Sequence, residues 1–259
     1  MTHLLLVGIG TGNPEHITLQ AIRALNSADL ILIPRKGAEK ADLADLRRTI
    51  CAAVLTNPAT RIAEFDLPRR DAETPDYLQG VEAWHDAIAT TWACTIDAEP
   101  GPKSRVALLV WGDPSLYDST LRIAERLGQS RALTTEVIPG ITALQALTAA
   151  HRIPVNTLGA PFLVTTGRQL RDHGWPEGTE TIAVMLDGTC AFQSLDPAGI
   201  TIWWGAYVGM AEEVTVAGDL KTLAPQILNT RAEARAAHGW IMDIYILRRS
   251  QPPETAQPS

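Results

Sequence analysis

Three apolar runs in the first half of the chain each stop at a glycine-containing turn, and each turn opens a helical pattern. The runs cover residues 4–7, 106–110 and 134–138, and the turns read GIGTGNP, GDP and PGITA. A strand, a turn and a helix repeated along a chain predict a parallel sheet with right-handed crossovers. Because small ligands bind at the carboxyl ends of such strands, the three turns are candidate binding loops.

The first turn resembles a dinucleotide fingerprint only in part. Gly8, Gly10 and Gly12 alternate, but Asn13 stands where that fingerprint needs its third glycine. Asp29 precedes the next apolar run, whereas a ribose-binding carboxylate would follow its strand. The spacing therefore argues against binding of a nicotinamide dinucleotide. Alternating glycines still allow a sharp turn or a close approach of ligand to backbone.

The central turn has two interpretations. Gly112 and Pro114 prevent simple continuation of the strand, and Asp113 lies between them. Asp113 either caps a tight strand-to-helix turn or contacts a ligand in a binding loop. Both interpretations remain open from these residues alone.

The second half of the chain predicts mostly strands, at residues 162–166, 181–186, 201–208, 213–216 and 240–247, with one helix at about 220–229. We expect a first α/β domain over residues 1–158, a second α/β domain with a mixed sheet over 159–250, and a disordered tail over 251–259. A cleft between two such domains is the natural ligand site. In the first domain, Trp84, Ile88 and Trp92 recur at helical spacing and predict the core face of a long helix.

Composition excludes several classes of function. A net charge of -7 offers no broad basic surface for a nucleic acid. No apolar run is long enough to cross a bilayer, and the start lacks the features of a signal peptide, so cytoplasmic residence is expected. Cys51, Cys94 and Cys190 form no metal-binding pattern and are expected to be buried free thiols.

The chain resembles the tetrapyrrole methylases, the S-adenosylmethionine-dependent enzymes of cobalamin and sirohaem synthesis. Three segments carry the resemblance over nearly the whole chain: VGIGTGNPEHITLQAIRALNSADLIL, WGDPSLYDST and PGITALQALTAAHRIP. Within the family, GIGTGNPEH looks like the branch of deacetylating C-1 methyltransferases, where most members resemble GxGPGDPE. Thr11 and Asn13 depart from the usual proline and aspartate of that loop.

The resemblance implies a bilobal fold, a homodimer, a tetrapyrrole substrate and a methyl donor, S-adenosylmethionine, bound between the lobes without a metal ion. The family's pattern assigns donor contacts to Thr11, Gly112, Asp113, Leu116, Tyr117, Thr142, Ala143, Met185, Gly205 and Ala206. Substrate contacts are expected from Gly10, Gly12, Arg35, Lys36 and Arg168, where the cations would meet the substrate's carboxylates. The branch implies methylation of precorrin-5 at C-1 with release of acetate.

Loss of acetate needs a base or an oxyanion donor near the macrocycle. His16 and Tyr117 are the candidates, and His151 is more distant. The sequence does not choose among them.

Other functions stay open. The chain could act at another precorrin or uroporphyrinogen methylation step, or on ribosomal RNA or a protein side chain, as enzymes with similar glycine loops do. It could also be a binding protein that keeps the site without turnover.

Overall fold

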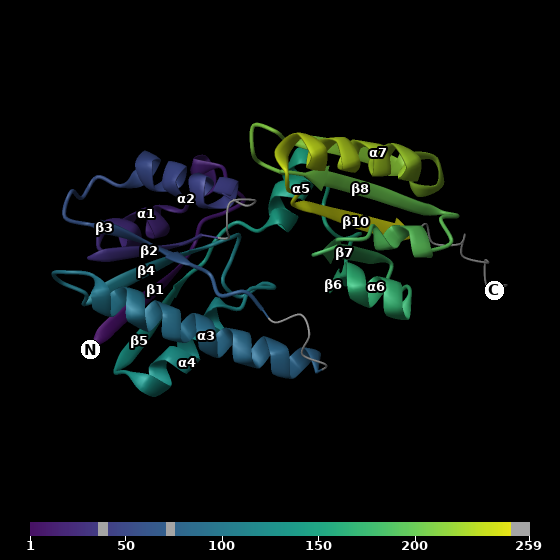
Figure 1. Ribbon diagram of the computed structural model, residues 1–259. Helices are drawn as coiled ribbons and strands as arrows, with labels where there is room; N and C mark the ends of the chain where they lie inside the picture. Colours follow the sequence, from purple (N-terminus) through teal and green to yellow (C-terminus); the bar gives the residue numbers. More distant parts are fainter. Residues whose placement is uncertain (36–40, 71–75, 250–259) are drawn as a thin grey trace. The chain divides into compact units, whose positions relative to one another are not determined.

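The computed structural model describes residues 1–35, 41–70 and 76–249, and the side chains of all of these except residues 41, 42 and 77. The described chain forms two compact units, which meet in the sequence between Thr142 and Ala143 (Figure 1). Lys36 and the predicted tail 251–259 lie outside the described residues.

The first unit is built around a five-stranded sheet of order β3-β2-β4-β1-β5, in which every pairing is parallel. The prediction of a parallel sheet is therefore confirmed. Its elements are β1 (Thr2–Gly8), η1 (Pro14–His16), α1 (Leu19–Asn26), β2 (Leu30–Arg35), α2 (Ala41–Val54), β3 (Arg61–Asp66), α3 (Tyr77–Ala98), β4 (Arg105–Val110), α4 (Thr120–Ser130) and β5 (Leu133–Ile138).

Strand β1 is apolar throughout because both faces of this sheet are covered. Leu5 and Val7 pack in the cluster that includes α1 and α2, while Leu4 and Leu6 pack in the opposite cluster with α3 and α4. Figure 1 shows these helix pairs on opposite faces of the sheet. Successive side chains of a strand point to opposite faces, so a strand buried on both sides reads as a continuous apolar run.

The predicted apolar face of α3 is confirmed where its side chains are described. Ile88 and Trp92 are buried in the cluster with α4, and Trp84 packs against its margin. Of the three cysteines, Cys51 and Cys190 are buried as expected. The expectation is wrong for Cys94, which is exposed because it lies on the outer face of α3.

The second unit contains a five-stranded sheet of order β6-β7-β10-β8-β9. Only the β6–β7 pair is parallel, so the predicted mixed sheet is confirmed. Its elements are α5 (Ala143–His151), β6 (Phe162–Thr166), α6 (Gly167–His173), β7 (Thr181–Met185), η3 (Ala191–Ser194), β8 (Ile200–Ala206), β9 (Val214–Asp219), α7 (Leu220–His238) and β10 (Asp243–Arg249).

Helix α5 belongs to the second unit, so that unit starts well before residue 158. Leu144 and Leu147 of α5 pack with Ala183, Ile244 and Ile246 on one face of the second sheet. Helices α6 and α7 contribute to the core on the other face. The expected boundary near residue 158 thus falls inside the second compact unit, because the apolar face of α5 is buried against the later strands.

Candidate functional site

The three glycine turns of the first unit lie side by side. Strand β1 is hydrogen-bonded to β4 on one side and to β5 on the other, and all three strands run parallel. Their carboxyl ends therefore bring together the turns that begin at Gly8, Gly112 and Pro139. The repeated strand-turn-helix pattern predicted the parallel sheet, and the strand order adds that the three turns are neighbours.

Two of the glycines are needed because the turns touch one another. A Cβ added to Gly140 would lie 2.0 Å from the carbonyl oxygen of Gly112 and 2.9 Å from the Cα of Gly8. A Cβ added to Gly8 would lie 2.6 Å from the nitrogen of Gly140. These distances leave no room for any side chain, so Gly8 and Gly140 hold the turns together rather than admitting a ligand.

The first and central turns are also joined by backbone hydrogen bonds. The N–H of Gly112 donates to the carbonyl of Gly10 at 2.8 Å, and the N–H of Gly10 donates back at 3.4 Å. Gly10 has a φ of +73° and Gly112 a φ of +59°. Both values lie in the left-handed region that favours glycine. Beside Gly112, the Cα of Thr142 lies 3.5 Å from the position that a Cβ would take, which is ordinary contact distance.

Asp113 fixes the central turn and ties it to the third turn. Its Oδ1 accepts hydrogen bonds from the N–H and hydroxyl of Ser115, and its Oδ2 accepts the N–H of Gly140 at 2.9 Å. Burial alone would raise the pKa of Asp113, but these hydrogen bonds outweigh burial and hold the pKa below 3.8. Asp113 is therefore more than the local cap that the sequence allowed, since it joins two binding-loop candidates.

Asp113→Asn is expected to destabilise the protein by about 1–3 kcal/mol at neutral pH. The side-chain NH2 group of the new asparagine would face a backbone N–H, of Ser115 or Gly140, that now donates to the carboxylate. The folded pKa is depressed, so the carboxylate's contribution is present above pH 3.8 and is lost as pH falls through the lower folded value. Urea unfolding of both proteins at several pH values measures this. The difference should stay constant from pH 7 to 5 and shrink below pH 3.8; a difference independent of pH throughout would contradict this role.

The other predicted residues of the first unit lie close to these turns in the chain. Thr11 is buried, and its hydroxyl lies 3.0 Å from Nδ1 of His16, which belongs to the short helix η1. Leu116 is half-buried, whereas Tyr117 is 43% exposed and has a positive φ of 50°. Partial burial raises the pKa of Tyr117, so the phenol stays a hydrogen-bond donor at neutral pH.

Three predicted donor contacts lie at strand ends of the second unit. Met185 is the last residue of β7, and Gly205 and Ala206 are the last two of β8. Gly205 is closely packed, since an added Cβ would lie 2.8 Å from Cδ1 of Leu147 in α5. Ala143 is the first residue of α5. Their contact with a methyl donor remains a prediction.

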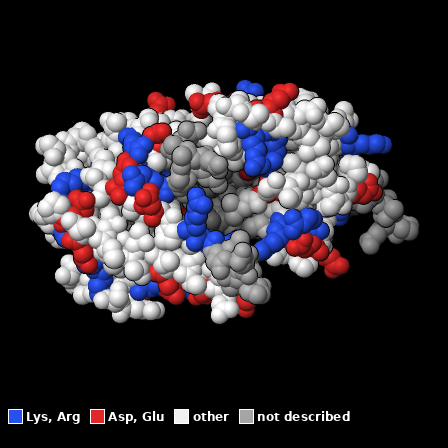
Figure 2. All heavy atoms as spheres, viewed as in Figure 1, with Lys and Arg blue, Asp and Glu red and all other residues white. Residues whose placement is uncertain are grey.

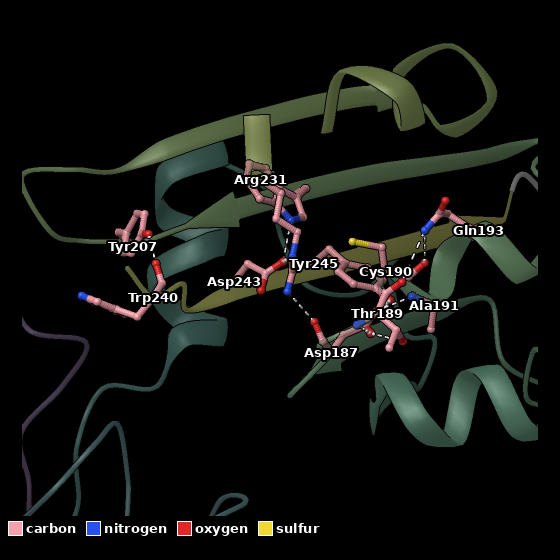
Figure 3. Close-up of polar contacts among 11 residues, drawn as sticks. Asp187, Thr189, Cys190, Ala191, Gln193, Tyr207, Arg231, Trp240, Asp243 and Tyr245 are labelled. Atoms are coloured by element: carbon pink, nitrogen blue, oxygen red, sulfur yellow. Dashed lines mark hydrogen bonds and ion pairs between the residues drawn. The ribbon is translucent and has the colours of Figure 1, made fainter. Parts of the chain in front are cut away.

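A buried polar network holds the turn that follows β7 (Figure 3). Asp187 accepts hydrogen bonds from the N–H of Thr189 at 2.9 Å and from the hydroxyl of Tyr245 at 2.6 Å. Arg231 donates to the carbonyl of Asp187 at 3.1 Å and to the carboxylate of Asp243 at 2.9 Å. Burial raises the pKa of Tyr245 far above its usual value, and the neighbouring Asp187 raises it further. The network fixes the turn next to Met185.

Gly167→Ala is expected to cost about 1–3 kcal/mol of stability by overpacking this network. An added Cβ would lie 2.3 Å from Cγ of Asp187, whose carboxylate is buried and held by several donors. Gly188→Ala is the matched control, because no atom lies within 4 Å of its added Cβ. Urea unfolding compares the two; equal stability of both variants and wild type would contradict the close contact.

Of the predicted substrate-binding cations, the structure describes Arg35 and Arg168. Arg35 ends β2 and is paired with Asp66, with Nε 3.0 Å from Oδ1. Arg168 is exposed on α6. On the face drawn in Figure 2, Lys and Arg side chains lie among Asp and Glu side chains on both units. His151 contacts the carbonyl of Trp204 at 3.0 Å through Nε2, which indicates a structural role.

Sequence reasoning did not select Gly140 or Asp187 as site residues. A signal existed for each: Gly140 follows Pro139 at a strand end, and Asp187-Gly188 follows β7 as a turn dipeptide. It also did not select Arg47, whose burial depends on packing that no local pattern reveals.

Comparison with known proteins identifies the family. The model of the Tetrapyrrole (Corrin/Porphyrin) Methylases matches residues 3–224. The chain is 49% identical, over 96% of both chains, to a precorrin-6A synthase [deacetylating] of Sinorhizobium sp. A putative cobalamin synthesis related protein (CobF) of Corynebacterium diphtheriae has 38% identity and a TM-score of 0.81, with 96% of this chain and 99% of that chain covered.

A more distant likeness supports the fold alone. The uroporphyrin-III C-methyl transferase of Thermus thermophilus, complexed with S-adenyl homocysteine, is 20% identical with a TM-score of 0.58, over 95% of this chain and 97% of that chain. The glycine turns, the two sheets and these likenesses agree over nearly the whole sequence. The chain therefore belongs to the tetrapyrrole methylase family.

Proposed function

We propose that this chain is an S-adenosylmethionine-dependent C-methyltransferase of cobalamin biosynthesis, which methylates precorrin-5 at C-1 and releases acetate to give precorrin-6A. The observation that carries the proposal is the likeness to a precorrin-6A synthase [deacetylating] over 96% of both chains. The GIGTGNPEH sequence of the first turn supports the same branch of deacetylating C-1 methyltransferases.

The first unit has a suitable surface for the methyl donor. Gly112 presents backbone without a side chain next to Thr142, where an added Cβ would lie 3.5 Å from the Cα of Thr142. Backbone N–H and C=O groups at such turns can bind the polar parts of a small ligand. We propose that Gly112, Leu116, Tyr117 and Thr142 contact the donor and that Asp113 keeps the central turn in shape.

The bound donor supplies a methyl group that is already activated on a sulfonium. The residues of this chain then need mainly to align the acceptor carbon and exclude water. The glycine contacts suit this task, because turns packed at backbone distance hold their geometry.

Release of acetate requires a proton acceptor. Water adds to the acetyl carbonyl and gives a proton to a base; the bond joining the acetyl group to the macrocycle breaks, and its electron pair stays with the macrocycle. We propose His16 as this base. When Nδ1–H donates to the hydroxyl of Thr11, 3.0 Å away, Nε2 is the basic nitrogen.

His16→Gln is expected to leave donor affinity unchanged and to slow acetate release by about 10²–10⁴, the usual contribution of a general base. Acetate is measured by a coupled enzymatic assay, and donor affinity by calorimetry. His151→Gln is the control, since His151 contacts a backbone carbonyl in the second unit. Normal acetate release from a folded His16→Gln protein would exclude His16 as the base.

The proposal includes a homodimer in the cytoplasm that uses no metal ion, and family resemblance supports these parts. None of the described helices is long and apolar enough to cross a membrane. Light scattering tests the dimer, and activity in the presence of a chelator tests the metal.

Ligand and acceptor binding test the function itself. Calorimetry should show binding of S-adenosylmethionine and S-adenosylhomocysteine and none of NAD; the reverse result would contradict the proposal. Donor consumption with a precorrin, ribosomal RNA or a protein acceptor separates the alternatives. A net charge of -7 disfavours RNA, whose phosphate backbone is bound by broadly basic surfaces.

A further inference from the structure

A cavity lies within the first unit, beside the central turn. Its volume is about 190 Å³, and residues of α2, α3, α4 and the carboxyl ends of β2, β3 and β4 line it. The walls are largely apolar and aromatic, with Phe65, Trp84, Trp92 and Trp111. Arg47 brings a positive charge to this cavity.

Arg47 is buried, with only 9% of its surface exposed. Its Nε donates to the carbonyl of Leu109 at 3.3 Å, and its Nη1 donates to the carbonyl of Leu43 at 3.1 Å. The guanidinium carbon lies 5.2 Å from the ring centre of Trp111. Among the described residues, Nη2 of Arg47 has no hydrogen-bond acceptor. Nη2 is not fully buried either, so a ligand can reach it.

The charge on Arg47 lacks an ion-pair partner in the described parts of the chain, where no carboxylate oxygen lies within 4.0 Å of it. Burial lowers the pKa of Arg47 to about 10, with Asp118 acting in the opposite direction, so the side chain stays charged at neutral pH. Asp118 also lines the cavity, where its Oδ1 accepts the N–H of Thr120, and its carboxylate makes no ion-pair contact with Arg47. A buried cation without a close counter-charge favours an anion as its ligand.

The size and lining of the cavity restrict that anion. A water molecule takes up about 30 Å³ of liquid, so the cavity exceeds one water, yet it is far smaller than a typical site of about 300–1,000 Å³. It therefore has no room for a macrocycle. Aromatic and aliphatic walls favour a short hydrocarbon chain, and Arg47 favours a carboxylate at its end.

We propose that this cavity binds a short aliphatic carboxylate, with Arg47 as its anchoring cation. Two sources share this chemistry: the acetate released in the proposed reaction and an acid side chain of the tetrapyrrole. The identification of the source rests on the proposed function, whereas carboxylate binding itself does not.

The first test uses the intact protein without donor or tetrapyrrole. Propionate is titrated while the indole N–H signals are followed by NMR, and propionamide is titrated as the uncharged analogue. We expect saturable shifts with propionate and none with propionamide. No saturation with propionate, or equal binding of both compounds, would overturn the proposal regardless of any variant.

Two variants and a matched control assign the binding to Arg47. Arg47→Met should weaken propionate binding at least about tenfold, since a hydrogen bond to a charged group is lost, and Arg47→Lys should retain part of it. Arg48→Met is the control, because Arg48 is the next residue of α2 but is partly exposed and paired with Glu64. Unchanged propionate affinity in a folded Arg47→Met or Arg47→Lys protein would also overturn the proposal.

Turnover then identifies the source. If the tetrapyrrole's side chain occupies the cavity, added propionate should raise the KM for precorrin-5 in the wild type, and raise it less in Arg47→Lys, which retains only part of the propionate binding. If the cavity receives released acetate, propionate should lower kcat with little change in KM. A failure of turnover with every acceptor would contradict the proposed function and leave the NMR result intact; active enzyme unaffected by saturating propionate would overturn the cavity's link to the reaction.

Discussion

Gly140→Ala is expected to abolish measurable donor binding while removing about 1–3 kcal/mol of stability through overpacking. The new Cβ would lie 2.0 Å from the carbonyl oxygen of Gly112, and 2.9 Å from the Cα of Gly8. Both neighbours are backbone atoms, so neither can move aside as a flexible side chain would. The central turn must shift, and it takes the hydrogen bond between Asp113 and Gly140 with it.

The measurements are donor titration by calorimetry and urea unfolding of the same samples. We expect donor affinity to fall more than about 100-fold, which corresponds to about 2.7 kcal/mol. Gly128→Ala is the control, because it lies in helix α4 with only Cδ2 of Leu133 near its added Cβ, at 3.9 Å. Its stability should rise slightly, as replacing a helical glycine usually does. Wild-type donor affinity in Gly140→Ala would show that the packed turns are not part of the donor site.

Gly112→Val is expected to give a folded protein with donor affinity reduced at least about tenfold, or 1.4 kcal/mol. Gly112 has a φ of +59°, where a residue with a Cβ costs about 1–2 kcal/mol. That cost is small beside a typical stability of about 5–15 kcal/mol, so the fold should survive. The branched side chain would nevertheless occupy the space in front of the turn, next to Thr142.

For Gly112→Val, circular dichroism should therefore show a wild-type fold, while donor titration should show the loss of affinity. Gly112→Ala serves as the graded comparison, since it also places a Cβ at positive φ but has less bulk and no branch at Cβ. A steeper loss of affinity for valine than for alanine would attribute the effect to blocked space. Normal donor affinity in a folded Gly112→Val protein would mean that this loop is only a turn.

Most of the fold could be predicted because its signals are local. The strand-turn-helix repeats of the first unit predicted the parallel sheet, and the apolar runs at β1 and β4 are long because those strands are buried on both faces. The strands of the second unit were also predicted from local apolar runs. Helix α6 was missed because it is short and follows β6 without a loop.

Other element ends depend on tertiary contacts. Helix α7 extends from Leu220 to His238, beyond its predicted end near residue 229, because its last turns are alanine-rich and polar and show no apolar period. Strand β10 begins at Asp243 rather than at Trp240. The carbonyl of Trp240 instead accepts a hydrogen bond from the hydroxyl of Tyr207. No local pattern announces such a contact.

The candidate site was predictable in outline and not in its contacts. The sequence pointed to the glycine turns, but Gly8 and Gly140 meet only because β1 and β5 are neighbours in the sheet. It also proposed Arg35 as a substrate cation, whereas Asp66 on the adjacent strand pairs with it. Pairings between distant segments depend on the register of the sheet, which single residues do not reveal.

In the proposed function, one chain couples methyl transfer to loss of an acetyl group. The most direct test incubates the enzyme anaerobically with precorrin-5 and a donor labelled in its methyl group, and measures labelled product and acetate in the same sample. We predict one methyl transferred to C-1 for each acetate released. Methyl transfer without acetate would place the enzyme at another step of the pathway, and no transfer to any precorrin would contradict its role in tetrapyrrole methylation.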